Sequence, residues 1–472
     1  MAEQILQLVQ LISNSAEDLV KTCDDLKLPL PHLHTLEKTP DAFRQNSVAR
    51  EATNVIIAAA LQLAATLAPP SSTMQNIACA HFKTAALRTC IESSVTEILR
   101  EEGSEGIHVE ALAKKCGLNG SKLSRILRVL ANDHIYREIT PDVFTNTRLS
   151  IELDTGKSIN EIQAEPECKH DGTQGFVALL EQMSSDPHKS SAYLYEVLKD
   201  PATAHSDDPC HTPMHRAFNI TIPRFKWYEL PEQAYRRRRF AIAMQGIGAI
   251  QSSDVLLQAF DWKRYQGSPS PVVVDVGGGI GASILPVVKA NQHLSFVIED
   301  LPHITELGRQ FYTQALPEAV ETRRVQFQNH DFLTPQPVQS PAVFVLYHII
   351  HNWSDKNATR ILRHLRDAAG PDTRLLVADF IVAYTCKDSA DEAERIPGAT
   401  LKPAPAPLLA NYGAVNETAY GLDMNMMTNL NAEERTFGKL YKLLLGAGWK
   451  IVRAHRGNPP GDFVQPVEAI PV

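Results

Sequence analysis

The 472-residue sequence lacks an excess of positive charge and lacks paired cysteine motifs. Its formal net charge of −8 argues against a nucleic-acid partner, because binding to phosphates usually requires a basic surface. The one basic run, Arg236–Arg239, is interpreted as a solvated helix face. Without a C-x-x-C pair, neither a zinc knuckle nor a disulfide framework is expected, and a reducing, cytoplasmic location is predicted. The cysteines are Cys23, Cys79, Cys90, Cys116, Cys168, Cys210 and Cys386.

The sequence also lacks a long apolar run near its start. MAEQILQLVQ has no basic stretch followed by an extended apolar one, so no signal peptide is predicted. The most apolar early segment, Val55 to Ala68, includes Gln62 and ends at Pro69 and Pro70. A membrane-spanning helix needs about 20 apolar residues, so this segment is too short and is expected to be a buried or dimer-contact helix. No membrane partner is therefore expected.

Residues 71–155 have the pattern of a compact winged-helix module, which follows a helical N-terminal segment, residues 1–70. The predicted elements are helices over Ala85–Arg100, Val109–Cys116 and Ser121–Asp133, the last with Ser121 as its N-cap, and strands over 135–139 and 143–145. A winged helix alone suggests DNA binding, and its third helix carries Lys122, Arg125 and Arg128. The acidic chain argues against that interpretation.

Residues 156–268 are predicted to form a broken helical connector that contributes to a substrate pocket. Its large side chains include Trp227 and Met244, which are candidates for contact with a flat substrate. Met426, much later in the chain, is a third candidate for the same pocket.

Residues 269–472 alternate between short β-branched runs and helical segments, which predicts a parallel, doubly wound sheet. The predicted strands contain Val272–Val274, Phe296–Ile298, Val325–Phe327, Val343–Leu346 and Leu375–Val377. A charged and Pro-rich stretch, residues 387–407, is expected to be an exposed loop inserted late in this domain.

The segment VVVDVGGGIGA, residues 272–282, is the most informative motif. It is predicted to run from strand through turn to helix, and Gly277, Gly279 and Gly281 let the backbone approach a ligand closely. The same spacing also satisfies the dinucleotide fingerprint. Alone, the motif indicates only a Rossmann-like nucleoside site.

Acidic residues near this motif distinguish between ligands. Asp275 would repel a pyrophosphate, but it suits a ligand that carries an ammonium and a sulfonium. Asp300, about 20 residues beyond the loop, suits ribose hydroxyls, which NAD and S-adenosylmethionine share. Asp331 and Phe332 follow a third strand, where a carboxylate can bond the adenine amine and a ring can stack on it. The alternative role for Asp300 and Asp331 is a helix N-cap.

With its later motifs, the sequence resembles the plant- and fungal-type O-methyltransferases, a class I methyltransferase family, over roughly residues 74–452. The motifs that match in order and spacing are VDVGGGIGA, EDLPH at 299–303, HDF at 330–332, HNWSD at 351–355, EERT at 433–436 and GAGW at 446–449. The resemblance implies a Rossmann-like catalytic domain preceded by a winged-helix dimerisation domain. It also implies S-adenosylmethionine as cofactor and a homodimer in which the winged helix covers the partner's pocket.

The resemblance assigns His351 as general base, with Asp379 and Glu434 as the carboxylates beside it. The implied cofactor-binding residues are Asp275, Gly277, Gly279, Asp300, Leu301, Asp331 and Phe332. Tyr347 departs from the family, which often has a basic residue there, and Glu299 and the longer insert are further departures. No metal is expected, because no His, Cys and Asp cluster has metal-ligand spacing.

Methyl transfer to a phenol needs a proton acceptor, since a phenol with a pKa of about 10 is mostly neutral at pH 7. His351 follows a predicted strand, at the edge where open α/β sheets bind ligands, and a carboxylate would fix its tautomer. The alternative is a structural histidine that bonds a backbone carbonyl. His348 is interpreted as a structural or pocket residue. The expected function is methylation of a phenolic or enolic hydroxyl of a small molecule in fungal secondary metabolism.

Two other functions remain open at this point. Some fungal relatives of the family are pericyclases that use the same fold and move no methyl group, and His134, Glu299 and Tyr347 are positions where such relatives could differ. The presence of His351 with Asp379 and Glu434 favours methyl transfer. The third function is a DNA-binding regulator built on the winged helix, for which salt-dependent DNA binding would be the signature.

Overall fold

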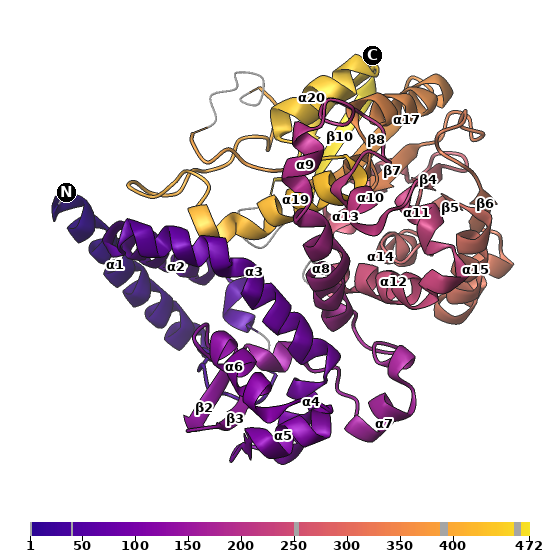
Figure 1. Cartoon of the computed structure of the whole chain (residues 1–472). Helices are drawn as coiled ribbons and strands as arrows, with labels where there is room; N and C mark the ends of the chain where they lie inside the picture. The colour runs from indigo at the N-terminus through magenta and orange to yellow at the C-terminus, as the bar shows by residue number, and fades with distance from the viewer. Residues whose placement is uncertain (1, 39–40, 250–253, 388–394, 457–463) are drawn as a thin grey trace. The chain divides into compact units, whose positions relative to one another are not determined.

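The computed structural model describes residues 2–38, 41–249, 254–387, 395–456 and 464–472. The chain forms two compact units (Figure 1). The first consists of residues 1–195 and 213–250, and the second of residues 196–212 and 251–472. The finer division of the sequence into four segments stays a prediction.

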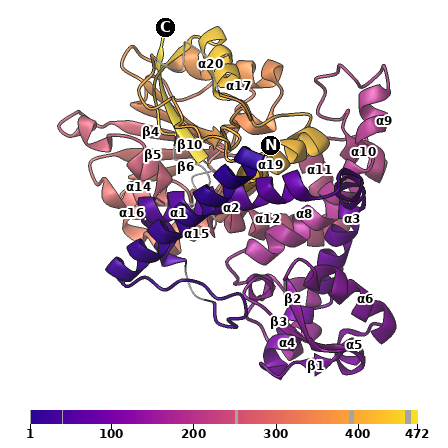
Figure 2. The same ribbon diagram turned by 90° about the vertical axis from the view of Figure 1, so that its left-hand side faces the viewer.

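The first unit is mostly helical and contains a small three-stranded sheet of order β1-β3-β2. In Figure 2 these strands lie beside α4, α5 and α6, the arrangement expected of a winged helix. The elements are α1 (Ala2–Leu26), α2 (Ser47–Leu67), α3 (Pro70–Glu92), α4 (Val95–Glu102), β1 (Ile107–His108), α5 (Val109–Cys116), α6 (Gly120–Ala131), β2 (Tyr136–Thr140), β3 (Val143–Asn146), α7 (Ile159–Ala164), α8 (Phe176–Ser191), α10 (Pro213–Phe218), α11 (Arg224–Tyr228) and α12 (Ala234–Ala249). Helix α9 (Leu194–Lys199) contains the boundary between the units in sequence.

Two predicted helix boundaries in the winged helix are wrong. The helix predicted over Ala85–Arg100 is interrupted at Ser94, whose φ of 53° lies in the left-handed region that a helix of L residues cannot continue through. Helix α6 is capped by Asn119, whose side chain accepts a hydrogen bond from the Lys122 backbone N–H, and not by Ser121. Strand β1 of this sheet was not predicted, because it spans only two residues and has no recognisable sequence pattern.

The early apolar helix α2 is longer than the sequence predicted. It begins at Ser47, where the Asn46 side chain accepts hydrogen bonds from two backbone N–H groups, and it has 21 residues. Among the described residues it is the one helix long and apolar enough to cross a membrane, so the prediction that this segment is too short is wrong. A single such helix is weak evidence for membrane insertion, because core helices of soluble proteins share these properties.

The interpretation of the basic run as a solvated face is wrong for Arg239, which is 4% exposed. Helix α12 packs against α8 and carries this guanidinium into a buried network. Arg239 lies 3.1 Å from Glu181 Oε1 and also donates to Gln182 Oε1. Arg236, earlier on α12, donates to Asp186 Oδ1 at 3.1 Å. The run therefore ties two helices of the first unit together.

Acid is expected to weaken the first unit through Glu181. Burial would raise the pKa of this carboxyl, but hydrogen bonds and charges from His170, Arg239 and Tyr235 hold it at about 2. A folded-state pKa below the unfolded value contributes stability above about pH 4.5 that is lost as the pH falls towards 2. We expect the urea midpoint of the wild type to drop over that range more steeply than that of Glu181→Gln. Asp171→Asn, which removes a surface pair with Arg238, is the control; equal slopes for wild type and Glu181→Gln would contradict the expectation.

The second unit is a seven-stranded sheet of order β6-β5-β4-β7-β8-β10-β9, in which β4 to β8 are parallel and β10 is antiparallel to its neighbours. The strands are β4 (Val272–Val276), β5 (Ser295–Asp300), β6 (Val325–Asn329), β7 (Val343–Tyr347), β8 (Arg374–Phe380), β9 (Trp449–Ala454) and β10 (Val464–Pro471). The helices are α13 (Val255–Gln258), α14 (Leu285–Ala290), α15 (Pro302–Ala315), α16 (Pro317–Glu321), α17 (Asp355–Ala368), α19 (Glu417–Leu430) and α20 (Phe437–Gly446). All five predicted strands are present.

Side chains alternate along the central strands and fill a core on each face of the sheet. On one face Val274 and Val276 pack with α17 and α20, and on the other Val273 packs with α14 and α15. Because both faces are covered, the central strands β4 and β7 are almost entirely apolar, whereas β5 and the edge strand β6 carry polar residues as well. Their carboxyl ends meet at one edge of the sheet, where the candidate site lies.

The late insert is less exposed than the sequence predicted. Of residues 387–407, positions 388–394 lie outside the described residues. Ala399 is fully buried in the core that contains α17 and α20, and its carbonyl accepts a hydrogen bond from Arg456. The Pro397 carbonyl accepts one from the Ala454 backbone N–H. This part of the insert therefore packs against the domain and is not simply a solvated loop.

Candidate active site

The buried pair of His351 and Glu434 is the centre of the candidate site. Strand β7 ends at Tyr347, and the following 3-10 turn, Ile350–Asn352, carries His351 at the carboxyl edge of the sheet. Its Nδ1 lies 2.7 Å from Glu434 Oε1, and both side chains are buried. Because Nδ1 is engaged, Nε2 is the remaining ring nitrogen for exchange with a substrate proton.

Two residues that sequence reasoning missed hold this pair in place. Asp423, on α19, accepts a hydrogen bond from the Glu434 backbone N–H at 2.8 Å. Arg435 donates to the backbone carbonyls of Ile350 and Trp353, at 3.0 and 2.8 Å. These bonds fix the Glu434 segment to the turn that carries His351. Arg435 directly follows Glu434 in the EERT motif. This position in the sequence was the signal that could have identified Arg435 as part of the site.

Asp379 adds a second carboxyl group to the site from the end of β8. Burial raises its pKa to about 6, with a further contribution from Glu434 that the His351 imidazole opposes. For His351, burial would lower the pKa, but the charges of Glu434 and Asp379 more than offset it and raise the pKa to about 9. The site therefore favours an imidazole with high proton affinity.

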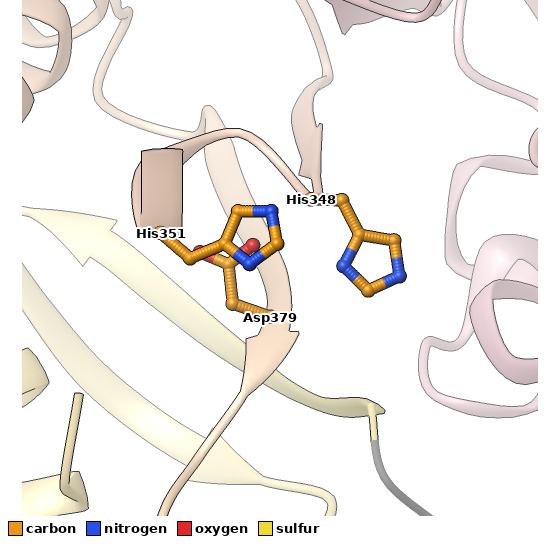
Figure 3. Close-up of side chains that lie close together, drawn as sticks. All are labelled: His348, His351 and Asp379. Atoms are coloured by element: carbon orange, nitrogen blue, oxygen red, sulfur yellow. The ribbon is translucent and has the colours of Figure 1, made fainter. Parts of the chain in front are cut away.

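His348 lies beside both His351 and the ring of Phe380, which are themselves 6.5 Å apart, and its position is not helical. Its φ is 57°, and its ring stacks on both neighbours with centroids 5.2 Å apart. Burial, and then the charge of His351, lowers its pKa well below the usual value. Figure 3 shows the His348 ring beside that of His351, with the Asp379 carboxylate behind the latter. Its proximity to Asp379 could not be read from the sequence.

The glycine motif forms a turn after β4, and helix α14 begins only at Leu285, beyond the motif. Gly277 and Gly279 have φ values of 69° and 61°, which L residues rarely adopt. A Cβ on Gly279 would meet nothing within 4 Å, so the backbone there faces open space. A Cβ on Gly278 would lie 2.3 Å from Asp275 Oδ2, so this glycine, which sequence reasoning passed over, is required by packing.

Buried acidic groups lie beside this turn. Burial, together with the charges of Asp300 and Glu299, raises the pKa of Asp275 to about 7, and burial raises that of Glu299 to about 7. Within the described part of the chain, Asp275 Oδ2 and Glu299 Oε1 have no hydrogen-bond partner. Asp300 accepts hydrogen bonds from the backbone N–H groups of Gly279 and Leu301, at 2.9 and 2.7 Å. An open glycine turn over carboxyl groups that each have one unpaired oxygen fits a nucleoside ligand that carries positive charge.

Phe332 lies next to the glycine turn, and its neighbours are more exposed. Its ring edge is 3.1 Å from the position that a Cβ on Gly277 would take. Asp331 is exposed and accepts a hydrogen bond from the Leu333 backbone N–H at 2.9 Å. This bond closes a turn and does not start a helix, so Asp331 is not the helix N-cap of the alternative interpretation. Leu301 is 42% exposed. The predicted cofactor residues thus surround one turn, with Asp331 and Leu301 at its solvent side.

Of the three predicted substrate-pocket residues, two lie in the first unit and one lies in the second. Trp227 is buried in the first unit, in a cluster with Met214 and Tyr228, while Met244 is 40% exposed on α12. Met426 is buried on α19 in the second unit. Their common pocket stays a prediction.

The chain matches two family models and a full-length fungal relative. Residues 195–395 match an O-methyltransferase domain, and residues 75–153 match an O-methyltransferase dimerisation domain. The relative is a protein named 4-O-methyltransferase 1 from Phanerochaete chrysosporium, which is 41% identical over 479 residues and covers all of both chains.

Solved structures with lower identity share the fold. A structure described as the mitomycin 7-O-methyltransferase MmcR superposes with a TM-score of 0.62 at 21% identity, covering 85% of this chain and 98% of that one. A structure described as a pericyclic reaction enzyme superposes with a TM-score of 0.67 at 19% identity, covering 91% and 97%. At these identities the likeness shows the fold alone. The family models and the full-length relative establish more: the chain belongs to the S-adenosylmethionine-dependent O-methyltransferases and carries the dimerisation domain of that family.

Proposed function

We propose that this enzyme methylates a phenolic or enolic hydroxyl of a small secondary metabolite, with His351 as the general base. The observation that carries the proposal is the buried 2.7 Å pair of His351 Nδ1 and Glu434 Oε1 at the carboxyl edge of β7. His351 also has a backbone hydrogen bond with His348, which a structural histidine can make, so the carboxylate is the feature that distinguishes it. Here a carboxylate engages one ring nitrogen, which is the arrangement that supports proton transfer at the other.

Each residue of the site has its own role in the proposed reaction. His351 accepts the hydroxyl proton at Nε2, which leaves the oxygen free to attack. In the neutral form of His351, Glu434 holds the proton on Nδ1 and leaves the lone pair on Nε2, and it stabilises the imidazolium that forms. Because the pKa of His351 is about 9, this neutral form is favoured at alkaline pH. Asp379 adds negative charge on the same side. S-adenosylmethionine, when bound, supplies the electrophilic methyl group on its sulfonium.

The cofactor is assigned to the glycine turn and the acids beside it. Gly277 and Gly279 provide the close approach, Asp300 is assigned to the ribose, and Phe332 to the adenine ring. Asp275 is assigned to the positively charged part of the ligand, supported by its unpaired buried oxygen. Asp331 and Leu301 are assigned to the exposed side of the nucleoside. Trp227, Met244 and Met426 are proposed to contact the substrate.

The interpretation as a DNA-binding regulator has lost its basis. The winged helix coincides with the dimerisation domain of the family, which accounts for it without DNA and supports the expected homodimer. Arg128, one of the basic residues that suggested DNA contacts, pairs with Glu138 and Asp142. The cytoplasmic location, and the absence of nucleic-acid and membrane partners, remain proposals.

Incubation with S-adenosylmethionine labelled in its methyl group tests the proposal. With a panel of phenols and enols, each paired with its O-methyl ether, we expect label in the acceptors that carry a free hydroxyl and none in the ethers. Binding of the cofactor, followed by calorimetry, shows that the protein used is competent. If the cofactor binds and no acceptor is labelled while a substrate is isomerised or cyclised, the pericyclase alternative replaces the proposal.

A further inference from the structure

Three side chains of the second unit converge in the manner of a metal site. His348, His351 and Asp379 each offer one ligand atom, and these atoms all lie within 4.8 Å of one another. They come from the segment after β7 and from the end of β8, two strands that are neighbours in the sheet. Figure 3 shows the three side chains grouped at this edge. Two imidazoles and one carboxylate form the ligand set of many zinc and iron sites.

The ligand atoms of this cluster have unused bonding capacity. In the described chain, both ring nitrogens of His348 and Oδ1 of Asp379 are buried without a hydrogen-bond partner. Buried polar atoms are rarely left unpaired, because each unpaired group costs about 1–3 kcal/mol. A ligand bound within the cluster would complete one nitrogen of His348 and Oδ1 of Asp379.

Glu434, behind the cluster, bonds His351 in the way that carboxylates bond histidine ligands in metal sites. A histidine ligand usually bonds a carboxylate or a carbonyl through its second ring nitrogen, which fixes the ring and raises its basicity. Glu434 does this for His351 Nδ1 at 2.7 Å. Since Glu434 engages Nδ1, Nε2 is the ring nitrogen of His351 that remains for an ion.

We infer that His348, His351 and Asp379 form a site for a divalent transition-metal ion such as Zn²⁺, and that occupation of this site inhibits methyl transfer. Zinc–nitrogen and zinc–oxygen bonds of about 2.0–2.2 Å place tetrahedral ligand atoms about 3.4 Å apart. The ligand atoms now lie within 4.8 Å of one another, so side-chain rotations must bring them closer together when an ion binds. The fourth position stays open to water or to an oxygen of the substrate.

Inhibition is expected because the metal ion and the substrate's hydroxyl proton would compete for the same electron pair of His351. An ion bound at His351 Nε2 occupies the lone pair that would otherwise accept the hydroxyl proton. The inhibitory part of the inference therefore rests on the proposed role of His351 as base, whereas metal binding itself does not. Methyl transfer without added metal remains the working reaction in this inference.

The test measures binding and activity separately, with His348→Phe as the main variant. Phenylalanine keeps an aromatic ring in the stack and removes two unpaired buried nitrogens, and His348 has no assigned part in proton transfer. His205→Asn, which removes an exposed histidine of the same unit, is the control. Co²⁺ added to each protein without cofactor or substrate is followed by visible absorption, and Zn²⁺ by calorimetry.

We expect one Co²⁺ or Zn²⁺ per chain in the wild type and in His205→Asn, and at least a 10-fold weaker affinity in His348→Phe. Zn²⁺ should inhibit the wild type, while His348→Phe should need at least 10-fold more Zn²⁺ to lose half of its own metal-free turnover. Equal metal affinity in wild type and His348→Phe, measured on proteins with similar melting temperatures, would overturn the site. Loss of activity on treatment with a chelator would overturn the inhibitory role. Failure of the base assignment would instead appear as full turnover of His351→Ala, whatever the metal binding.

Discussion

His351→Ala is expected to lower kcat for methyl transfer by about 10²–10⁴-fold, the usual contribution of a general base. The variant removes the one side chain that offers a ring nitrogen beside the Glu434 carboxylate. Cofactor affinity should stay within about 3-fold of the wild type, because the glycine turn and Asp300 are assigned to that ligand. Single-turnover label transfer measures the chemical step, and calorimetry measures the affinity.

Two further variants separate the base from its surroundings. Glu434→Gln loses a charge-assisted hydrogen bond, worth about 1.5–3 kcal/mol, and should lower kcat by about 10- to 100-fold. Glu318→Gln is its control, since Glu318 is an exposed glutamate of α16 in the same unit. His293→Ala controls for loss of an imidazole, because His293 precedes β5 at the opposite edge of the sheet and bonds the Trp262 carbonyl. Full single-turnover rate in His351→Ala would remove His351 from the mechanism.

The sheet could be predicted from the sequence because the pattern that indicates each strand lies within a few consecutive residues. Runs such as Val272–Val274 and Val343–Leu346 are apolar at every position, which is what a strand covered on both faces requires. The helix over Ala85–Arg100 has equally good periodicity, yet it breaks at Ser94, where tertiary packing places one residue in the left-handed region. The Arg236–Arg239 run has the composition of a surface, and only the packing of α12 on α8 shows that Arg239 is buried.

Part of the candidate site could likewise be predicted from the sequence, and part could not. His351, Glu434 and the glycine turn were predicted, because each lies in a short motif with chemistry of its own. Gly278 was missed, since its requirement arises from the Asp275 carboxylate beneath it. Asp423 and the grouping of His348 with Asp379 were also missed, because they depend on contacts between segments distant in sequence. Spacing along the chain carries no information about such contacts.

Asp300→Ala is expected to raise the Kd for S-adenosylmethionine by about 10²-fold or more. The Asp300 carboxylate holds the backbone N–H groups of Gly279 and Leu301, so it fixes the open turn and the start of α15 together. Each hydrogen bond to a charged group is worth about 1.5–3 kcal/mol, and 1.4 kcal/mol is tenfold in affinity. Because the carboxylate is assigned to the ligand's ribose as well, its loss removes both the shape of the site and a direct contact.

The comparison with Asp300→Asn distinguishes these two contributions. Asparagine keeps one acceptor oxygen for the turn but loses the charge, so its Kd should lie between those of the wild type and Asp300→Ala. kcat at saturating cofactor should change by less than about 3-fold in both, since neither variant touches His351. Asp367→Asn, on the exposed side of α17, should bind as the wild type does. If calorimetry gives Asp300→Ala the affinity of the wild type, Asp300 only caps its local turn, and the unpaired oxygens of Asp275 and Glu299 must bind the cofactor without it.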